Sequence, residues 1–156
     1  MNSHHTVAIG TWEGDKQQSI EYNSSIAVGI DCPRAKLRVS ILLDTIQEYQ
    51  VRYIFSDEEI SEAVNEAGLI IGARGIAYEG VLQRKPVIVV GEYGFGGLVT
   101  PDTLHEQYNN YFRGKINGIK AEYFSLERLE EEIRRGFALT FQELQMMSNQ
   151  TIRSVS

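Results

Sequence analysis

Short apolar segments alternate with longer segments of helical periodicity along most of this chain, and several of the apolar segments end at a glycine. Strands are expected at 6–10, 25–30, 51–55, 69–71 and 86–90. Helices are expected at 34–50, 56–67, 76–84, 101–112, 125–135 and on to about 148. Strands that alternate with helices are typical of parallel sheets covered on both faces. The pattern therefore predicts a three-layer, Rossmann-like α/β domain with a mostly parallel sheet and a helical C-terminal third.

The length of the chain sets the number of domains. A chain of 156 residues, of which 42% are hydrophobic, suffices for one domain with a substantial core. We expect this domain to span residues 1–148, with 149–156 as a polar tail that frays. Ser56 and Ser125 are expected to begin two of the helices, because serine accepts hydrogen bonds from the first turn.

The charge and the cysteine content narrow the classes of function. The chain has 15 Lys and Arg against 21 Asp and Glu, which gives a net charge of -6. Nucleic-acid binding needs a basic face, so no nucleic-acid partner is expected. A single cysteine, Cys32, excludes an internal disulfide and a cysteine-rich zinc site, and the histidines have no metal-ligand spacing. Without an apolar stretch of about 18 residues or a targeting segment, we predict no membrane span and a cytoplasmic location.

A glycine turn between a predicted strand and a helix is the strongest candidate for a site. In residues 69–79, Gly72 and Gly75 would let a bulky anion approach the backbone. The amides near 74–77 would be unpaired donors at a helix N-terminus, and Arg74 adds a guanidinium suited to phosphate. Alternatively, the two glycines only permit a tight turn and close packing.

An acidic residue follows one turn into the same predicted helix. The carboxylate of Glu79 is able to accept hydrogen bonds from a cis-diol such as the hydroxyls of a ribose. Alternatively, Glu79 is only a favourable partner for the helix dipole, worth about 0.3–1 kcal/mol.

Two further segments are weaker candidates. Residues 91–97 contain four glycines directly after the most apolar segment, which predicts a mobile loop whose aromatic residues, Tyr93 and Phe95, could cover a base or a sugar. The alternative is a flexible surface turn. Lys16, after the first predicted strand, is a candidate cation for a phosphate, and a solvated loop is the alternative there.

Residues 66–101 resemble the nucleotide-sugar-binding half of GT-B glycosyltransferases. That family has a strand, a glycine turn, a helix that carries a glutamate, and a proline-led strand seven residues after the glutamate, a spacing that Glu79 and Pro86 keep. Residues 96–101 resemble the loop that follows in bacterial members. Arg84 stands where the family has a glycine, and Thr11 and Ile71 stand where retaining members have an arginine and a glutamate, which leaves retaining or inverting chemistry open.

The resemblance implies a role for each candidate. The donor diphosphate would be held by Gly72, Ala73, Arg74, Gly75 and Ile76, the ribose by Glu79, and the sugar or phosphate by Gly94, Gly96 and Gly97. Lys16 and Arg74 would be catalytic, because they would neutralise the leaving diphosphate.

The resemblance also implies the reaction, which is glycosyl transfer from a nucleotide sugar. A UDP-sugar is expected as the substrate, with no separate cofactor. An acceptor-binding domain or a partner subunit would complete the site. A non-catalytic module of the same fold that binds a nucleotide or another phosphorylated ligand remains the alternative.

Overall fold

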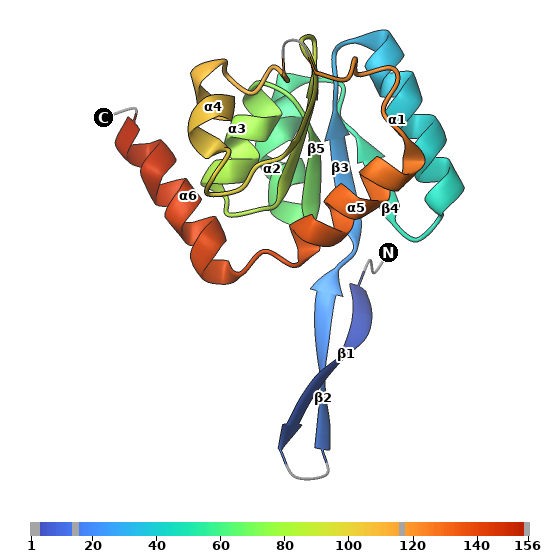
Figure 1. The fold of residues 1–156 in the computed structure, drawn as a ribbon, viewed down its shortest axis with the longest axis vertical. Coiled ribbons are helices and arrows are strands. Elements are labelled where there is room, and N and C mark those ends of the chain that lie inside the picture. The colour runs from blue at the N-terminus through green and yellow to red at the C-terminus, as the bar shows by residue number, and fades with distance from the viewer. Residues whose placement is uncertain (1–3, 14–15, 116–117, 155–156) are drawn as a thin grey trace.

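A five-stranded sheet forms the centre of the computed structural model, which describes residues 4–13, 16–115 and 118–154, with side chains from Asn23 onward. The strand order is β4-β3-β5-β6-β7, and the first four run parallel while β7 runs antiparallel to β6. The bounds are β3 Ser25–Gly29, β4 Gln50–Tyr53, β5 Leu69–Gly72, β6 Val87–Gly91 and β7 Gly94–Leu98. This arrangement confirms the predicted Rossmann-like α/β fold (Figure 1).

Helices cover both faces of the sheet and complete the three layers. They are α1 Pro33–Ile46, η1 Asp57–Glu59, α2 Ile60–Glu66, α3 Gly75–Leu82, α4 Leu104–Asn109, α5 Leu126–Phe137 and α6 Phe141–Ser154. One hydrophobic core contains buried residues of α1 and α5, and the other contains buried residues of α2, α3, α4 and α6. No helix among the described residues is long and apolar enough to span a bilayer.

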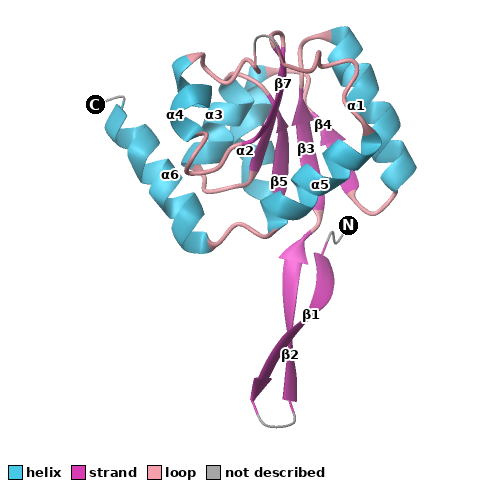
Figure 2. Ribbon diagram, in the orientation of Figure 1, coloured by secondary structure: helices cyan, strands magenta, loops and turns pink. Residues whose placement is uncertain are grey.

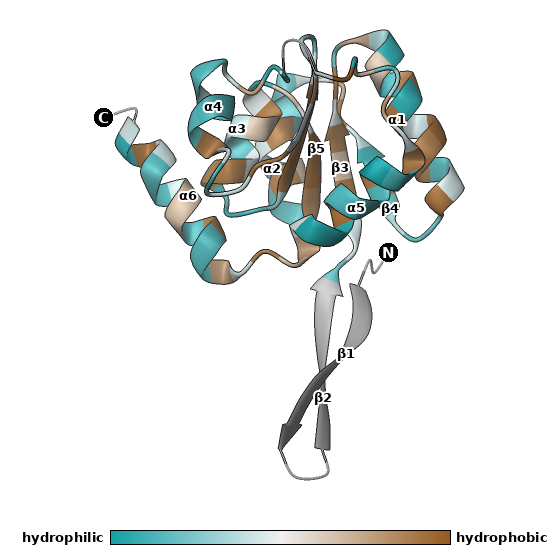
Figure 3. Ribbon diagram, in the orientation of Figure 1, coloured by the Kyte–Doolittle hydropathy of each residue, from teal (hydrophilic) through white to brown (hydrophobic). Residues whose placement is uncertain are grey.

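The two cores divide the strand residues by alternation. Ile26 and Val28 of β3 belong to the core under α1 and α5, while Ala27 between them belongs to the opposite core. Leu69 and Ile71 of β5 alternate with Ile70 in the same way. Because both faces are buried, the central strands are apolar along their length, as Figure 3 shows for β3 and β5.

The first predicted strand does not join the central sheet. Residues 6–10 lie in β1, His4–Glu13, which pairs antiparallel with β2, Lys16–Asn23, as a separate two-stranded sheet. Only a short connection separates the two strands, which suits an antiparallel hairpin, whereas a parallel pair requires a crossover of a dozen or more residues. The hairpin leads directly to the amino end of β3 (Figure 1).

The glycine-rich segment after β6 is a strand and not a mobile loop. It forms β7, which Figure 2 shows as a strand. The pairing of β7 with β6 contains an irregularity between Val89 and Val90. Phe95 and Leu98 of this strand are buried in the core under α5. A Cβ at Gly96 would lie 2.8 Å from Oε1 of Gln107. Glycine therefore leaves room for the Gln107 side chain, whose Nε2 donates a hydrogen bond to the carbonyl of Gly96.

Helices α6 and α4 have different bounds from those expected, and the expected start of α5 is confirmed. Helix α6 continues to Ser154, and Thr151 is buried, so residues 149–154 are not a frayed tail. Helix α4 begins at Leu104 instead of Pro101, because hydroxyl and amide groups of Thr100 and Thr103 form a turn before it. The expected cap of α5 is confirmed, since Oγ of Ser125 accepts a hydrogen bond from the amide of Arg128 at 3.1 Å.

Candidate functional site

A pocket of about 590 Å³ lies at the carboxyl ends of the parallel strands. Strand β3 has β4 on one side and β5 on the other, so the chain reverses its direction of progress across the sheet at β3. Helices that leave two neighbouring strands toward opposite faces open a crevice at such a switch point. In doubly wound sheets this crevice is where ligands bind, and the pocket occupies that place.

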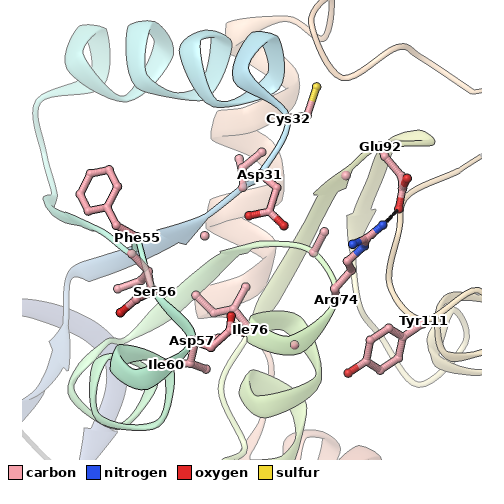
Figure 4. A pocket seen from close by; sticks show the side chains of 16 residues that line it. Asp31, Cys32, Phe55, Ser56, Asp57, Ile60, Arg74, Ile76, Glu92 and Tyr111 are labelled. Atoms are coloured by element: carbon pink, nitrogen blue, oxygen red, sulfur yellow. Dashed lines mark hydrogen bonds and ion pairs between the residues drawn. The ribbon is translucent and has the colours of Figure 1, made fainter.

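Loops from four strands line the pocket (Figure 4). They contribute Asp31 and Cys32 after β3, Phe55, Ser56 and Asp57 after β4, Ala73, Arg74, Gly75 and Ile76 after β5, and Glu92 after β6. Gly91 at the end of β6 and Tyr111 also line the pocket. Figure 4 shows the residues that follow β4 on one side and Arg74, Glu92 and Tyr111 on the other. A ligand in the pocket is therefore able to extend across the start of α3.

The first turn of α3 presents backbone donors to the pocket. Gly75 and Ile76 line the pocket, and no side chain caps the helix, whose N-cap residue is Arg74. Among the described residues, none accepts a hydrogen bond from the amides of Gly75, Ile76 or Ala77. Unpaired amides and the helix dipole together favour a negative group at this position.

The two glycines of this turn differ in what they permit. A Cβ at Gly72 would lie 2.6 Å from Cγ2 of Ile76 and closer still to the carbonyl oxygen of Gly29. A Cβ at Gly75 would meet only Cδ1 of Ile60, at 3.8 Å. Gly72 is therefore needed for close packing, which was the alternative interpretation of the pair, whereas Gly75 leaves open space beside the unpaired amides.

Arg74 is held at the pocket in an unusual backbone conformation. Its φ is 56° and its ψ is -126°, and its amide donates a hydrogen bond to the carbonyl of Phe112 at 3.0 Å. The half-exposed guanidinium donates to Oε1 of Glu92 through Nε at 3.1 Å and through Nη2. The hydrogen bond and the charge of Glu92 raise the pKa of Arg74. The positive charge near the start of α3 is thus partly balanced by a carboxylate.

Glu79 lies outside the pocket, although it belongs to the same helix. It is half-buried, and its Oε2 accepts a hydrogen bond from Nε2 of Gln83 at 2.7 Å. The carboxylates that line the pocket are those of Asp31, Asp57 and Glu92. The structure therefore places Glu79 one turn beyond the lining residues, beside a partner on its own helix.

The remaining predicted residues divide into two groups. Ala73, Arg74, Gly75 and Ile76 come together at the pocket, while Gly94, Gly96 and Gly97 lie in β7 and Lys16 begins β2 in the separate hairpin. None of this second group is among the described residues that line the pocket. The side chain of Lys16 lies outside the described part of the structure.

Several pocket residues were not predicted from the sequence, although their position just after a strand could have indicated them. Asp31, Ser56 and Glu92 are among the first polar residues after the parallel strands β3, β4 and β6, and parallel strands bring such residues to one edge. Within the described residues, no group of three or more His, Cys, Asp and Glu side chains is placed to hold a metal ion.

Comparisons with protein-family models, with curated proteins and with solved structures found no match to this chain. The class of protein is therefore defined by its fold and by its pocket. It is a Rossmann-like α/β domain with an anion-favouring helix N-terminus at the switch point of the sheet.

Proposed function

We propose that this chain binds a nucleoside diphosphate, as part of a nucleotide sugar, and serves as the donor-binding half of a GT-B-like glycosyltransferase. One observation carries the proposal, namely that the unpaired amides at the start of α3 open into a pocket at the switch point of the sheet. The pocket volume of about 590 Å³ lies within the range of about 300–1,000 Å³ that is usual for small-molecule sites.

The distribution of charge in the pocket orients the ligand. The diphosphate belongs at the start of α3, since the amides and the dipole favour a negative group there. Asp57 and Ser56 lie on the β4 side, where a carboxylate and a hydroxyl suit the uncharged hydroxyls of a ribose. Phe55 is 76% exposed and lies on the same side, where the ring face that Lys36 does not cover is able to stack on the base. The sugar end then points toward Arg74 and Tyr111.

Glycosyl transfer from this arrangement makes one chemical demand on the domain. The bond between the anomeric carbon and the diphosphate oxygen breaks, and the diphosphate leaves with the electron pair. The amides of α3 and the guanidinium of Arg74 stabilise the negative charge that develops on the leaving group. The acceptor and its general base come from an acceptor-binding domain or a partner subunit.

A non-catalytic nucleotide-binding module is the second candidate. It uses the same pocket. The ion pair of Arg74 with Glu92 favours this candidate, because Glu92 already neutralises the guanidinium that would otherwise stabilise the leaving diphosphate. Hydrolysis or transfer of a labelled sugar, with and without a candidate partner chain, separates the two candidates.

Calorimetric titration with UDP, GDP and dTDP tests binding, and a dissociation constant of about 10 µM to 1 mM is expected. Gly75→Asp places a carboxylate beside the unpaired amides at the start of α3, where the diphosphate is proposed to bind. It is expected to weaken nucleotide binding by about 10-fold or more through charge repulsion. Gly75→Asn is the matched control of equal size, and we expect it to change the affinity by less than about 3-fold. The open space at Gly75 lets both variants fold.

The proposal is contradicted if none of the three nucleotides binds, or if Gly75→Asp binds them as tightly as Gly75→Asn does. Glu79→Ala reports separately on the ribose. The family role of Glu79 predicts a loss of about 1.5–3 kcal/mol of binding free energy. The proposed orientation places the ribose on the β4 side of the pocket and therefore predicts an unchanged affinity, whereas a loss of that size would place the ribose at Glu79.

A further inference from the structure

Two arginines converge on one carboxylate oxygen beside the pocket, which Arg74 and Glu92 line and Arg113 does not. Oε1 of Glu92 accepts hydrogen bonds from the guanidinium of Arg74, and Nε of Arg113 lies 3.5 Å from the same oxygen. Nη1 of Arg113 donates to the hydroxyl of Tyr93 at 3.2 Å. Two guanidinium groups thus share the charge of Glu92, and the carboxylate of Asp31 also acts on Arg74 from the pocket.

Backbone hydrogen bonds hold these residues together from three separate segments. The amide of Arg74 donates to the carbonyl of Phe112 at 3.0 Å, and the amide of Tyr93 donates to the carbonyl of Arg113 at 2.9 Å. A Cβ at Gly91 would lie 2.5 Å from that same carbonyl oxygen, so the segments approach as closely as a glycine allows. The convergence of the two guanidinium groups is therefore built into the fold.

The backbone at this cluster is strained. Arg74, Tyr111 and Phe112 have φ values of 56°, 57° and 55°, a region that residues with a side chain rarely adopt. Such conformations persist where the surroundings enforce them, and they concentrate at ligand sites. One of the strained residues is Arg74 itself, and the other two, Tyr111 and Phe112, are the two residues before Arg113.

The carboxylate does not satisfy both arginines. Nε of Arg113 is buried, and no described residue accepts a hydrogen bond from it. A charged donor that is buried without an acceptor is unfavourable. A phosphate group has three strong acceptor oxygens, so it is able to serve two guanidinium groups where one carboxylate oxygen does not.

We propose that Arg74 and Arg113 form a phosphate-binding pair that Glu92 occupies until the terminal phosphate of the bound nucleotide displaces it. The inference rests on the proposed function, in which a nucleoside diphosphate lies across the start of α3. The Glu92 side chain is 43% exposed and is able to turn into solvent when the phosphate enters. Because Glu92 competes for the arginines, it lowers the affinity of the unmodified protein for the ligand.

The test is a titration of UDP and of UMP into the whole chain and its variants at one fixed ionic strength. Glu92→Gln removes the competing charge and is expected to tighten UDP binding by about 5-fold or more, while UMP, which lacks the terminal phosphate, changes by less than about 2-fold. Adding Arg113→Gln to Glu92→Gln is expected to remove the gain. Glu122→Gln is the matched control, since it makes the same change in net charge at the exposed ion pair with Arg34.

The outcomes separate this inference from the proposed function. If UDP binds but Glu92→Gln leaves its affinity unchanged or weaker, or if Glu122→Gln gives the same gain, the arginine pair is not a phosphate site. If none of the proteins binds UDP, the proposed function fails. Titration with inorganic pyrophosphate then tests whether Arg74 and Arg113 form a phosphate site. Tighter pyrophosphate binding to Glu92→Gln than to the unmodified protein supports the pair, and equal or absent binding overturns it.

Discussion

A methyl group at Gly72 tests how the strands are held together beneath the pocket. Gly72 of β5 pairs directly with Gly29 of β3, and Ile76 of α3 lies over the pair. The added Cβ would lie 2.6 Å from Cγ2 of Ile76, where ordinary contact begins at 3.4 Å, so a shift of about 0.8 Å is needed. The carbonyl of Gly29 is closer still and is backbone, which has no rotamer to change.

The magnitude of this effect follows from overpacking. Extra methylenes in a well-packed core lower the free energy of unfolding by about 1–3 kcal/mol. We expect Gly72→Ala at the upper end of this range, because one of the atoms it meets is the backbone carbonyl of Gly29. Alanine also lowers the conformational entropy of the unfolded chain relative to glycine, and this offsets about 0.5–1 kcal/mol of the loss. We therefore expect a net loss of about 2 kcal/mol, or about 4–8 °C in Tm for a domain of this size.

Thermal and urea unfolding followed by circular dichroism measure the change, with Gly75→Ala as the matched control. The Cβ of Gly75→Ala meets only Cδ1 of Ile60 at 3.8 Å, and alanine is favoured over glycine in a helix by about 1 kcal/mol. Its Tm should equal or exceed that of the unmodified protein. A Gly72→Ala variant within about 0.5 kcal/mol of the unmodified protein would refute the reasoning, because the close approach of β3, β5 and α3 would then not exist.

Other consequences of the fold are open to the same unfolding assay. Buried Glu132 accepts hydrogen bonds from the amide of Leu98 and from Arg135. Glu132→Ala should therefore lower the free energy of unfolding by about 2–3 kcal/mol, and Glu132→Gln should lower it clearly less. Equal losses for the two variants would contradict this. Arg84 has a φ of 60° at the end of α3, and Arg84→Gly should stabilise by about 0.5–1 kcal/mol; a loss of stability would contradict this. Burial lowers the pKa of Lys85, so the unfolded chain binds more protons between that pKa and 10.5, and stability should rise with pH across this window. Lys85→Met should remove that rise, and an unchanged pH profile would contradict the assignment to Lys85.

The parts of the fold that the sequence predicted are those with strong apolar patterns. Strands β3, β5 and β6 are buried on both faces, so each is a continuous apolar segment bounded by turn residues. Strand β7 escaped prediction because three of its five residues are glycines, which carry no periodicity. The helical residues 149–154 escaped because they are mostly polar, and Thr151 is buried nonetheless.

The candidate site was predictable where it is local in the sequence and not where it is assembled by tertiary contacts. The turn from Gly72 to Ile76 carries its own signal, because a glycine pair links an apolar strand to a helix start. The ion pair of Arg74 with Glu92 joins residues 18 positions apart, and Arg113 arrives from a third segment. The position of Glu79 relative to the pocket depends on the rotation of α3, which the sequence spacing does not specify.

The central claim is that the amides at the start of α3 are the seat of the diphosphate. A titration of the ¹⁵N-labelled protein with UDP, followed through the amide resonances of Gly75, Ile76 and Ala77, measures this directly. We expect these three resonances to shift together and to saturate with the calorimetric affinity, and we expect Gly75→Asp to suppress the shifts of Ile76 and Ala77. Resonances that stay in place while UDP binds elsewhere, or that do not respond to UDP at all, would contradict it.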